Sequence, residues 1–305
     1  MKFLDFIRIQ NLILIILTQV FIRYGIFIPM GADLGLSDFQ FILLVISSVS
    51  IAAGGNIIND IYDIEIDQIN KPSKVYIGRY ISEKSASNLF ITLNIIGVGI
   101  GFYLSNIIGK PAFAAIFIII SASLYLYAFY LKKILLLGNL LISVLVGLSL
   151  IVVGIFDLLP VITAENQIIQ ASAFKWVSKF AFFAFFINFI REIVKDLLDI
   201  NGDKKGNINS LPIILGRKRT VFIVFLLSLI FLFFVLYFMY RELYNQQIPM
   251  LYFLITIVAP LLVFVVKSWD AEKNKEYQLL SNLLKIIMLF GIFAMVIFRF
   301  FMFNN

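Results

Sequence analysis

One stretch decides how this chain folds: Asn56-Ile-Ile-Asn-Asp-Ile-Tyr-Asp-Ile-Glu-Ile-Asp67, which closes a long apolar segment and runs on into Lys71-Pro72-Ser73-Lys74. In a helix, Asn59, Asp63 and Asp67 follow at steps of four, so three oxygen-bearing side chains share one face. Like charges at this spacing repel each other. A bound divalent cation is the usual compensation for such a row at the mouth of a membrane segment. We call these three residues the first acidic line.

The second acidic line consists of Asp196, Asp199 and Asp203, and it also closes an apolar segment. The stretch reads Arg191-Glu-Ile-Val-Lys-Asp-Leu-Leu-Asp-Ile-Asn-Gly-Asp203, in which the aspartates follow helical steps of three and four. If the two lines face each other, they could hold two cations that prefer oxygen ligands, with a polyphosphate between them. The alternative is a pair of solvated helix ends flanked by lysines, but two helically phased sets favour the cation site.

The composition is that of an integral membrane protein. The 305 residues are 61% hydrophobic and 14% charged, and the mean hydropathy is +0.99, far from the balance of a soluble domain. Apolar runs of about 20 residues, the length that crosses a bilayer, recur from end to end. We therefore expect one transmembrane domain over residues 1–305.

Two missing residue types limit the chemistry. The chain has no cysteine and no histidine, which excludes disulfides, thiolate or imidazole metal ligands and a histidine base. Asp, Glu, Lys, Arg, Tyr and Asn remain to act on a substrate. The net charge of +7 is explained by membrane topology, and no stripe of Lys and Arg interleaved with aromatics suggests a nucleic-acid partner. No obligate protein partner is evident either.

The apolar runs predict an all-α protein with about nine transmembrane helices. Lysine and arginine collect in the loops after the second, fourth, sixth and eighth helix, so the positive-inside rule predicts a cytoplasmic N-terminus. Both acidic lines then fall on the cytoplasmic side of the plasma membrane. The expected helices are Phe3–Pro29, one from the loop Gly31–Asp38 to the first acidic line, Ser87–Ile108, one from the turn Gly109-Lys110-Pro111 to Tyr130, Leu135–Ile155, Phe174–Leu198, Thr220–Tyr240, Met250–Val266 and one ending near Phe303.

A diphosphate held by magnesium beside an apolar cavity suits one reaction class, the departure of diphosphate from an allylic carbon. The allylic cation needs a pocket without competing water, lined by aromatic faces. Four tyrosines near the acidic lines are candidates for that lining, although each also fits the aromatic belt of a membrane interface. They are Tyr62, Tyr125, Tyr127 and Tyr130.

Other polar residues are candidates for binding phosphate oxygens. Asn59 has the strongest case, because its amide offers a neutral oxygen to a cation or a donor to a phosphate. Asn11 could cap the site from the first helix, whereas Arg23 is expected to extend to the outer surface or to pair with another helix. The cationic candidates, which topology alone would also explain, are Lys71, Lys74, Arg79, Lys133 and Lys204.

These motifs resemble those of the UbiA superfamily of intramembrane prenyltransferases. The first signature matches Asn59-Asp60-x-x-Asp63-x-x-x-Asp67 with Ile69-Asn70-Lys71-Pro72, and the second matches Asp199-x-x-x-Asp203. The likeness covers most of the chain, including Gly78-Arg79-x-Ile81-Ser82-x-Lys84 and Leu211-Pro212-Ile213-x-Leu215-Gly216. It implies nine helices, a central cavity open sideways to lipid, and Mg²⁺-dependent transfer of a polyprenyl group from its diphosphate. It also implies that the metal–diphosphate complex is held by Asn59, Asp63, Asp67, Asp199 and Asp203.

Within the superfamily, Arg191-Glu192-x-x-Lys195-Asp196-x-x-Asp199-x-x-Gly202-Asp203 resembles the members that make digeranylgeranylglyceryl phosphate. The donor is then geranylgeranyl diphosphate, and the acceptor is the hydroxyl of geranylgeranylglyceryl phosphate. The chain departs from the family at Arg8-Ile9-Gln10-Asn11, where Arg-Pro-x-Asn is frequent, and at Asn207-Ile208-Asn209, where the family is more basic.

The acceptor side of the site rests on charged residues before and after Asp199. Arg191, Lys195 and Lys205 would bind an acceptor phosphate. Asp196, Glu192 or the released diphosphate would take the acceptor proton. An aromatic, quinone-precursor acceptor is the alternative within the enzyme class.

An ion-coupled transporter is the alternative outside the enzyme class, because intramembrane acids also mark ion pathways. Transport sites tend toward the bilayer midplane, whereas these acids gather at one interface beside loops rich in Lys and Arg. A scaffold protein would leave the two acidic lines without a cause.

Overall fold

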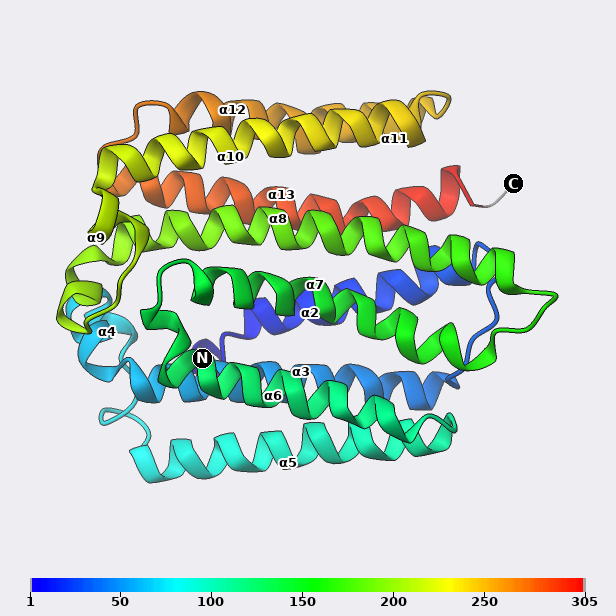
Figure 1. The fold of residues 1–305 in the computed structure, drawn as a ribbon, viewed down its shortest axis with the longest axis horizontal. Coiled ribbons are helices and arrows are strands. Elements are labelled where there is room, and N and C mark those ends of the chain that lie inside the picture. Colours follow the sequence, from blue (N-terminus) through cyan, green and yellow to red (C-terminus); the bar gives the residue numbers. More distant parts are fainter. Residues whose placement is uncertain (1, 304–305) are drawn as a thin grey trace.

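The computed structural model describes residues 2–303, with the side chains of all of these except Lys2 and Lys74. The described residues form a bundle of long helices that run along one common direction (Figure 1). The α-helices are α1 (Lys2–Phe6), α2 (Ile9–Ile22), α3 (Asp38–Tyr62), α4 (Ile64–Asn70), α5 (Glu83–Ile107), α6 (Ala114–Phe129), α7 (Leu137–Asp157), α8 (Gln167–Lys205), α9 (Leu211–Leu215), α10 (Arg217–Phe238), α11 (Gln247–Phe253), α12 (Ala259–Ser268) and α13 (Asn274–Phe301).

Short segments of other helix types extend or join these helices. The π-helical segments are η1 (Arg23–Phe27) after α2, η6 (Met239–Leu243) after α10 and η7 (Leu254–Val258) between α11 and α12. The 3₁₀ segments are η2 (Pro72–Lys74), η3 (Pro111–Phe113), η4 (Leu131–Lys133) and η5 (Leu159–Val161).

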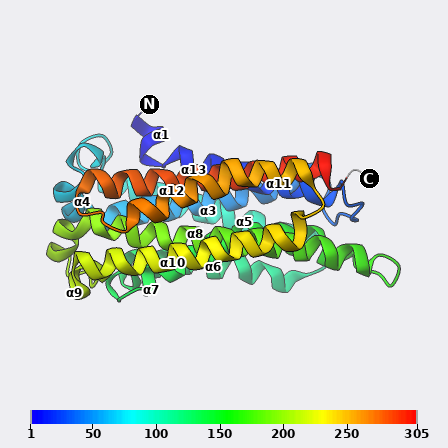
Figure 2. The same ribbon diagram turned by 90° about the horizontal axis from the view of Figure 1, so that it is seen from above.

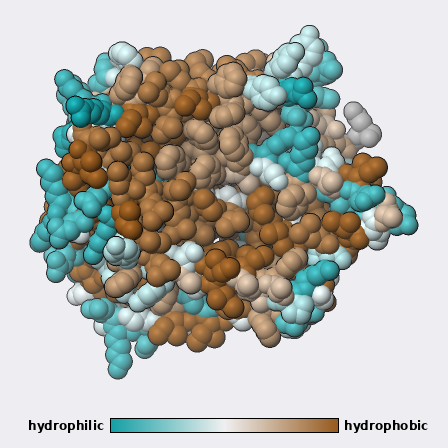
Figure 3. Space-filling view, in the orientation of Figure 1, coloured by the Kyte–Doolittle hydropathy of each residue, from teal (hydrophilic) through white to brown (hydrophobic). Residues whose placement is uncertain are grey.

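The prediction of an all-helical, multi-pass membrane protein is confirmed. Eight helical segments of the described chain are long and apolar enough to cross a membrane. The 39-residue α8 runs alongside them but carries charges in both halves. In the space-filling view, apolar atoms cover the middle of the face shown and hydrophilic atoms gather at its two ends (Figure 3), as expected for a protein solvated by lipid.

Two predicted helices differ from those observed. The expected first helix is broken at Arg8, whose φ of 57° and ψ of 52° are left-handed, so α1 and α2 are separate. The expected sixth helix is longer than predicted, because α8 begins at Gln167 and ends at Lys205. The break at Arg8 coincides with an ion pair between its guanidinium and Asp60 near the end of α3, a long-range contact that hydropathy does not report.

The central helix α8 packs against α7, α13, α10 and α4. Its close approach to α7 depends on Gly147, where a Cβ atom would lie 3.2 Å from the Ala181 carbonyl oxygen. Small residues of this kind let membrane helices come together without side chains between them. On another face of α8, the Phe183 ring lies 6.0 Å from Phe231 and 5.3 Å from Phe238 of α10. Aromatic packing therefore holds α10 to the centre of the bundle.

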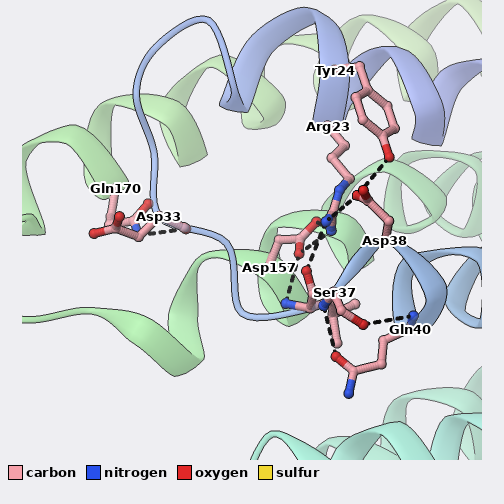
Figure 4. A network of polar contacts seen from close by, with 9 residues as sticks. Arg23, Tyr24, Asp33, Ser37, Asp38, Gln40, Asp157 and Gln170 are labelled. Atoms are coloured by element: carbon pink, nitrogen blue, oxygen red, sulfur yellow. Dashed lines mark hydrogen bonds and ion pairs between the residues drawn. The ribbon is translucent and has the colours of Figure 1, made fainter.

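Both acidic lines lie at one end of the bundle, where α4 and α9 also lie in both views (Figures 1 and 2). We call this the acidic end. A buried ion pair lies at the opposite end (Figure 4). Arg23 Nη1 lies 2.7 Å from Asp157 Oδ1, and Nη2 donates to the Leu36 carbonyl at 2.8 Å and contacts Asp38 at 3.1 Å. Of the two expectations for Arg23, pairing with another helix is therefore the one observed.

The Arg23–Asp157 pair should be a major source of stability. Both side chains are buried, so Asp157→Ala would leave an uncompensated buried charge and cost about 3–5 kcal/mol. Asp38→Ala, at a side chain that is 77% exposed, should cost about 1 kcal/mol or less. The double variant Arg23→Leu/Asp157→Leu should recover much of the loss, because no charge is left unpaired. The midpoints of thermal unfolding in detergent measure the relative stability of the three variants. Equal decreases in the midpoint for Asp157→Ala and Asp38→Ala would contradict the prediction.

Candidate active site

A cavity of about 920 Å³ occupies the acidic half of the bundle and extends toward its middle. Its wall is polar at the acidic end and apolar deeper inside, where isoleucine, leucine and phenylalanine side chains replace the charged ones. Pockets for small ligands typically measure roughly 300–1,000 Å³. The cavity therefore has room for a large substrate with a charged head and an apolar body.

The first acidic line enters the cavity at a break between two helices. The predicted continuous helix is wrong at Asp63, where φ of −101° and ψ of 8° separate α3 from α4. Helical hydrogen bonds still cross the break, because the Asp63 N–H donates to the Asn59 carbonyl at 2.9 Å and the Asp67 N–H donates to the Asp63 carbonyl at 2.8 Å. All three side chains consequently line the cavity.

The second acidic line is joined to the first through Asn70 at the end of α4. Asn70 Nδ2 donates to the Asp199 carbonyl at 2.9 Å, and Asn70 Oδ1 accepts from the Gly202 N–H at 2.8 Å. The neighbouring Lys71 Nζ lies 2.6 Å from Asp199 Oδ2. A Cβ atom on residue 202 would lie only 2.7 Å from the Ile66 carbonyl oxygen, so this glycine allows α4 to dock. The expected convergence of the two lines is present in the structure.

Lysine and arginine side chains form ion pairs with three of the carboxylates at this end. Lys132 Nζ lies 2.6 Å from Asp63 Oδ1 and 3.4 Å from Asn59 Oδ1. Lys71 pairs with Asp199, and Arg8 pairs with Asp60. These pairs place three cations beside the acidic lines, where they are available to phosphate oxygens.

The oxygen donors of the two lines fit a hard divalent cation. Burial raises the pKa of the Asp67 carboxyl to about 6, against the opposing effect of Lys71 and with a further contribution from Asp63. The described residues contain no ready-made cluster of three acids around one point. The five donors nonetheless line one end of one cavity, and carboxylate and amide oxygens without sulfur or imidazole are the ligand set that suits Mg²⁺. They are Asn59, Asp63, Asp67, Asp199 and Asp203.

A mixed cluster lies next to the second acidic line on α8. Lys195 Nζ lies 2.7 Å from Glu192 Oε1, and Arg191 Nη1 lies 3.7 Å from the same oxygen. Asp196 Oδ2 instead accepts from Asn139 Nδ2 of α7 at 2.9 Å. All five side chains line the cavity. Two cations here share one carboxylate, whereas Asp196 is hydrogen-bonded to a neutral amide.

Most of the predicted site residues line the cavity, and five do not. Arg79 Nη1 donates to the Pro72 carbonyl at 2.8 Å on an exposed loop, and Tyr130 is 55% exposed. Lys133, Lys204 and Lys205 are exposed and outside the cavity wall, so the prediction that Lys205 lines the site is wrong. The Lys74 side chain lies outside the part of the structure that is described. Those in the cavity wall are Asn11, Asn59, Asp63, Asp67, Lys71, Arg191, Lys195, Asp196, Asp199 and Asp203.

The structure adds residues that the sequence did not single out. Lys132 lines the cavity in place of its neighbour Lys133, and Asn139 lines it from α7. Among the candidate tyrosines, Tyr127 is the one in the cavity wall, whereas the Tyr62 and Tyr125 hydroxyls lie 3.2 Å apart at an exposed position. A pair of adjacent lysines gives no sequence signal of which one points inward, because the choice depends on where the helix end meets its neighbours.

A model of the UbiA prenyltransferase family matches residues 20–290. The chain belongs to this family. It is therefore a prenyltransferase, and the transporter and scaffold alternatives lose their support. A digeranylgeranylglyceryl phosphate synthase of Methanosphaera stadtmanae is 31% identical over 251 residues, which cover 82% of this chain and 84% of that protein.

Solved structures share the fold of this UbiA-family chain. One is a structure from work on digeranylgeranylglyceryl phosphate synthase in membranes. It is 24% identical to this chain with a TM-score of 0.63, and the match covers 98% of this chain and 97% of that one. Another, a UbiA homologue from Archaeoglobus fulgidus bound to GPP and Mg²⁺, is 15% identical with a TM-score of 0.59 and covers 97% and 99%. Because both sequence identities are low, these two structures support the helical fold of this chain and nothing further.

Lys132 and Lys133 provide a matched test of the cavity in this prenyltransferase. The Lys132 side chain is 8% exposed and contacts Asp63, whereas Lys133 is exposed outside the cavity. Lys132→Ala should raise the KM for the prenyl diphosphate about 10- to 100-fold, the value of one hydrogen bond to a charged group. Lys133→Ala should leave it within about twofold. Steady-state kinetics at varied donor concentration measure the KM of both variants. A larger rise in KM for Lys133→Ala than for Lys132→Ala would show that the cavity is misassigned.

Proposed function

We propose that this prenyltransferase transfers a geranylgeranyl group from geranylgeranyl diphosphate to the free hydroxyl of geranylgeranylglyceryl phosphate. The observation that carries the proposal is the junction of the two acidic lines, with their paired cations, at the polar end of a large apolar cavity. The Methanosphaera stadtmanae relative, a digeranylgeranylglyceryl phosphate synthase, supports the same acceptor.

The donor diphosphate binds at the acidic end. Lys71, Lys132 and Arg8 would each exchange a carboxylate partner for phosphate oxygens, which are stronger ligands because they carry more charge. The oxygen donors Asn59, Asp63, Asp67, Asp199 and Asp203 would hold Mg²⁺, whose charge offsets that of the leaving diphosphate.

Bond breaking at the allylic C–O bond leaves diphosphate and an allylic cation, and the acceptor hydroxyl oxygen then forms the new ether bond. Tyr127 supplies an aromatic face near the charge that develops, and the apolar wall excludes water that would compete with the acceptor. The acceptor proton leaves as the ether forms. Asp196 is a better base than Glu192, because Asp196 accepts a hydrogen bond from the neutral amide of Asn139 whereas Glu192 is paired with Lys195 and Arg191.

We infer further that the acidic end faces the cytoplasm and that the protein lies in the plasma membrane. The support is the concentration of Lys and Arg in the loops at this end and their scarcity in the loops at the other. The N-terminus would then be cytoplasmic as well.

The metal site can be tested by replacing one carboxylate of each acidic line. Asp63→Asn and Asp199→Asn should each lower kcat by about 10²–10³-fold or more, as expected for groups that stabilise charge in the transition state. Glu65→Gln is the control, because Glu65 lies between Asp63 and Asp67 but is exposed and outside the cavity wall. Removal of divalent cations by EDTA should abolish transfer, and Mg²⁺ should restore it.

The measurement is transfer of labelled geranylgeranyl groups, with the product identified by mass. Thermal unfolding of each variant shows that it is folded. Undiminished turnover in both Asp63→Asn and Asp199→Asn would refute the assignment. Geranylgeranylglyceryl phosphate and 1,4-dihydroxy-2-naphthoate offered in parallel separate the lipid acceptor from the aromatic alternative.

A further inference from the structure

The turn between α6 and α7 contacts both acidic lines. It lies at the acidic end of the bundle (Figure 1), and two of its residues, Lys132 and Asn139, line the cavity. Lys132 contacts Asp63 of the first acidic line. Asn139 Nδ2 donates to Asp196 Oδ2 of the second acidic line at 2.9 Å. One short segment therefore supplies a partner to one carboxylate of each line.

The backbone of this turn is folded tightly enough to bring both side chains to the same cavity. Leu136 has a left-handed conformation with a φ of 59°, which is uncommon for a residue other than glycine. A Cβ atom on Gly138 would lie 2.8 Å from the Lys132 Cα atom, so the glycine allows the turn to close on itself. Asn139 follows directly, in the first turn of α7, and faces α8.

The contact leaves Asp196 with one bound oxygen and one free oxygen. An ionised carboxylate only accepts hydrogen bonds, so the amide of Asn139 must present its NH₂ group to it. Asp196 Oδ2 receives this bond, whereas Oδ1 has no hydrogen-bond partner among the described residues and keeps some accessible surface. Because Asp196 lines the cavity, the free oxygen is open to a ligand there.

The neutral amide distinguishes Asp196 from its neighbours on α8. Asp199 is paired with Lys71, and Glu192 is paired with Lys195. An ion pair favours the ionised carboxylate and so weakens it as a proton acceptor. An amide also orients a carboxylate but brings no full positive charge. Asp196 is therefore held in one orientation and remains a competent base.

We propose that Asn139 is the positioning residue for Asp196, whose Oδ2 it holds so that Oδ1 takes the proton of the acceptor hydroxyl. This inference rests on the proposed function, in which Asp196 is the base. The hydroxyl oxygen forms the new bond to the allylic carbon, the diphosphate leaves with the electron pair of the broken C–O bond, and the hydroxyl proton passes to Asp196 Oδ1. Proton transfer needs the two oxygens about 2.6–3.2 Å apart. A carboxylate that is free to rotate would meet this condition less often, without any change in substrate binding.

The test compares Asn139→Leu with Ser143→Ala on the same helix. Ser143 is buried and lies outside the cavity wall. Its hydroxyl bonds to the Asn139 backbone carbonyl and to Asn188 Nδ2 of α8, so Ser143→Ala removes a polar contact between α7 and α8 and leaves the Asn139 amide in place. Asn139→Leu should lower kcat for transfer to geranylgeranylglyceryl phosphate about 10- to 100-fold, part of the roughly 10²–10⁴-fold that a positioned base contributes. The KM values for donor and acceptor should stay within about twofold, and Ser143→Ala should change kcat and KM by no more than that.

A double-mutant cycle with Asp196→Asn shows whether Asn139 acts through the base. In the Asp196→Asn background, Asn139→Leu should lower kcat by no more than about twofold, because the partner of the amide is already lost. A further tenfold loss in that background, a raised KM for the donor, or an equal loss in Ser143→Ala would overturn the inference. Asn139→Ala replaces the leucine variant if thermal unfolding shows that the leucine variant does not fold.

An infrared measurement separates this inference from the proposed function, because it needs no acceptor. The sample is the whole protein with isotopic label in its aspartate carboxyl groups. The difference spectrum between wild type and Asn139→Leu should contain a shifted carboxylate band, and this band should be absent when the same difference is taken in the Asp196→Asn background. That result supports the positioning of Asp196 even if no transfer to the lipid acceptor occurs, in which case only the proposed reaction fails. A spectrum without such a shift would overturn the inference.

Discussion

The docking of α4 onto the end of α8 is the contact on which the site depends. Asn70 bonds to both the Asp199 carbonyl and the Gly202 N–H, groups that lie 129 and 132 positions away in the chain. Hydrogen bonds to backbone groups fix position more sharply than apolar packing, because an amide has few acceptable geometries. Without this contact, only the Lys71–Asp199 ion pair and the packing of α4 on α8 would set the distance between the carboxylates of α3 and α4 and those of α8.

Ion pairs lower the cost of gathering acids at the mouth of an apolar cavity. Isolated charges are expensive there, and the cost falls when a carboxylate has a cation partner. Lys132, Lys71 and Arg8 provide such partners for Asp63, Asp199 and Asp60, whereas Asp67, Asp196 and Asp203 have no ion pair among the described residues. On the proposed function, these cations would exchange their carboxylate partners for the anionic head of the substrate. The same side chains would then serve both the stability of the protein and its affinity for a phosphate.

The two ends of the bundle are built for opposite purposes. The acidic end is wide, and its polar groups face a cavity. At the other end, the Arg23 guanidinium donates to Asp157 and to the Leu36 carbonyl, and neither Arg23 nor Asp157 is in the cavity wall. A site from which water is excluded is a requirement for any reaction through an allylic cation. The interior between the ends is apolar enough to hold prenyl chains.

Local features of the sequence were sufficient for the membrane class, the helical architecture and the family. Apolar runs mark the spans of a multi-pass bundle, and the paired Asn59–Asp67 and Asp199–Asp203 motifs led to the prenyltransferase fold that the family match confirms. These properties are readable because hydropathy and helical spacing act over a few turns. The roles of the individual site residues stay predictions, although ten of the predicted side chains share one cavity wall.

Only the tertiary structure decided the details of the site. Helices end at Arg8 and at Asp63 within stretches that were predicted to be continuous. Lys132 and Tyr127 line the cavity, whereas Lys133 and Tyr130 do not, and Asn70 bonds to Gly202. Each outcome depends on which face of a helix meets its neighbours and on how closely a glycine lets two backbones approach. Such choices are made by packing between segments far apart in the chain, so no pattern within one segment can report them.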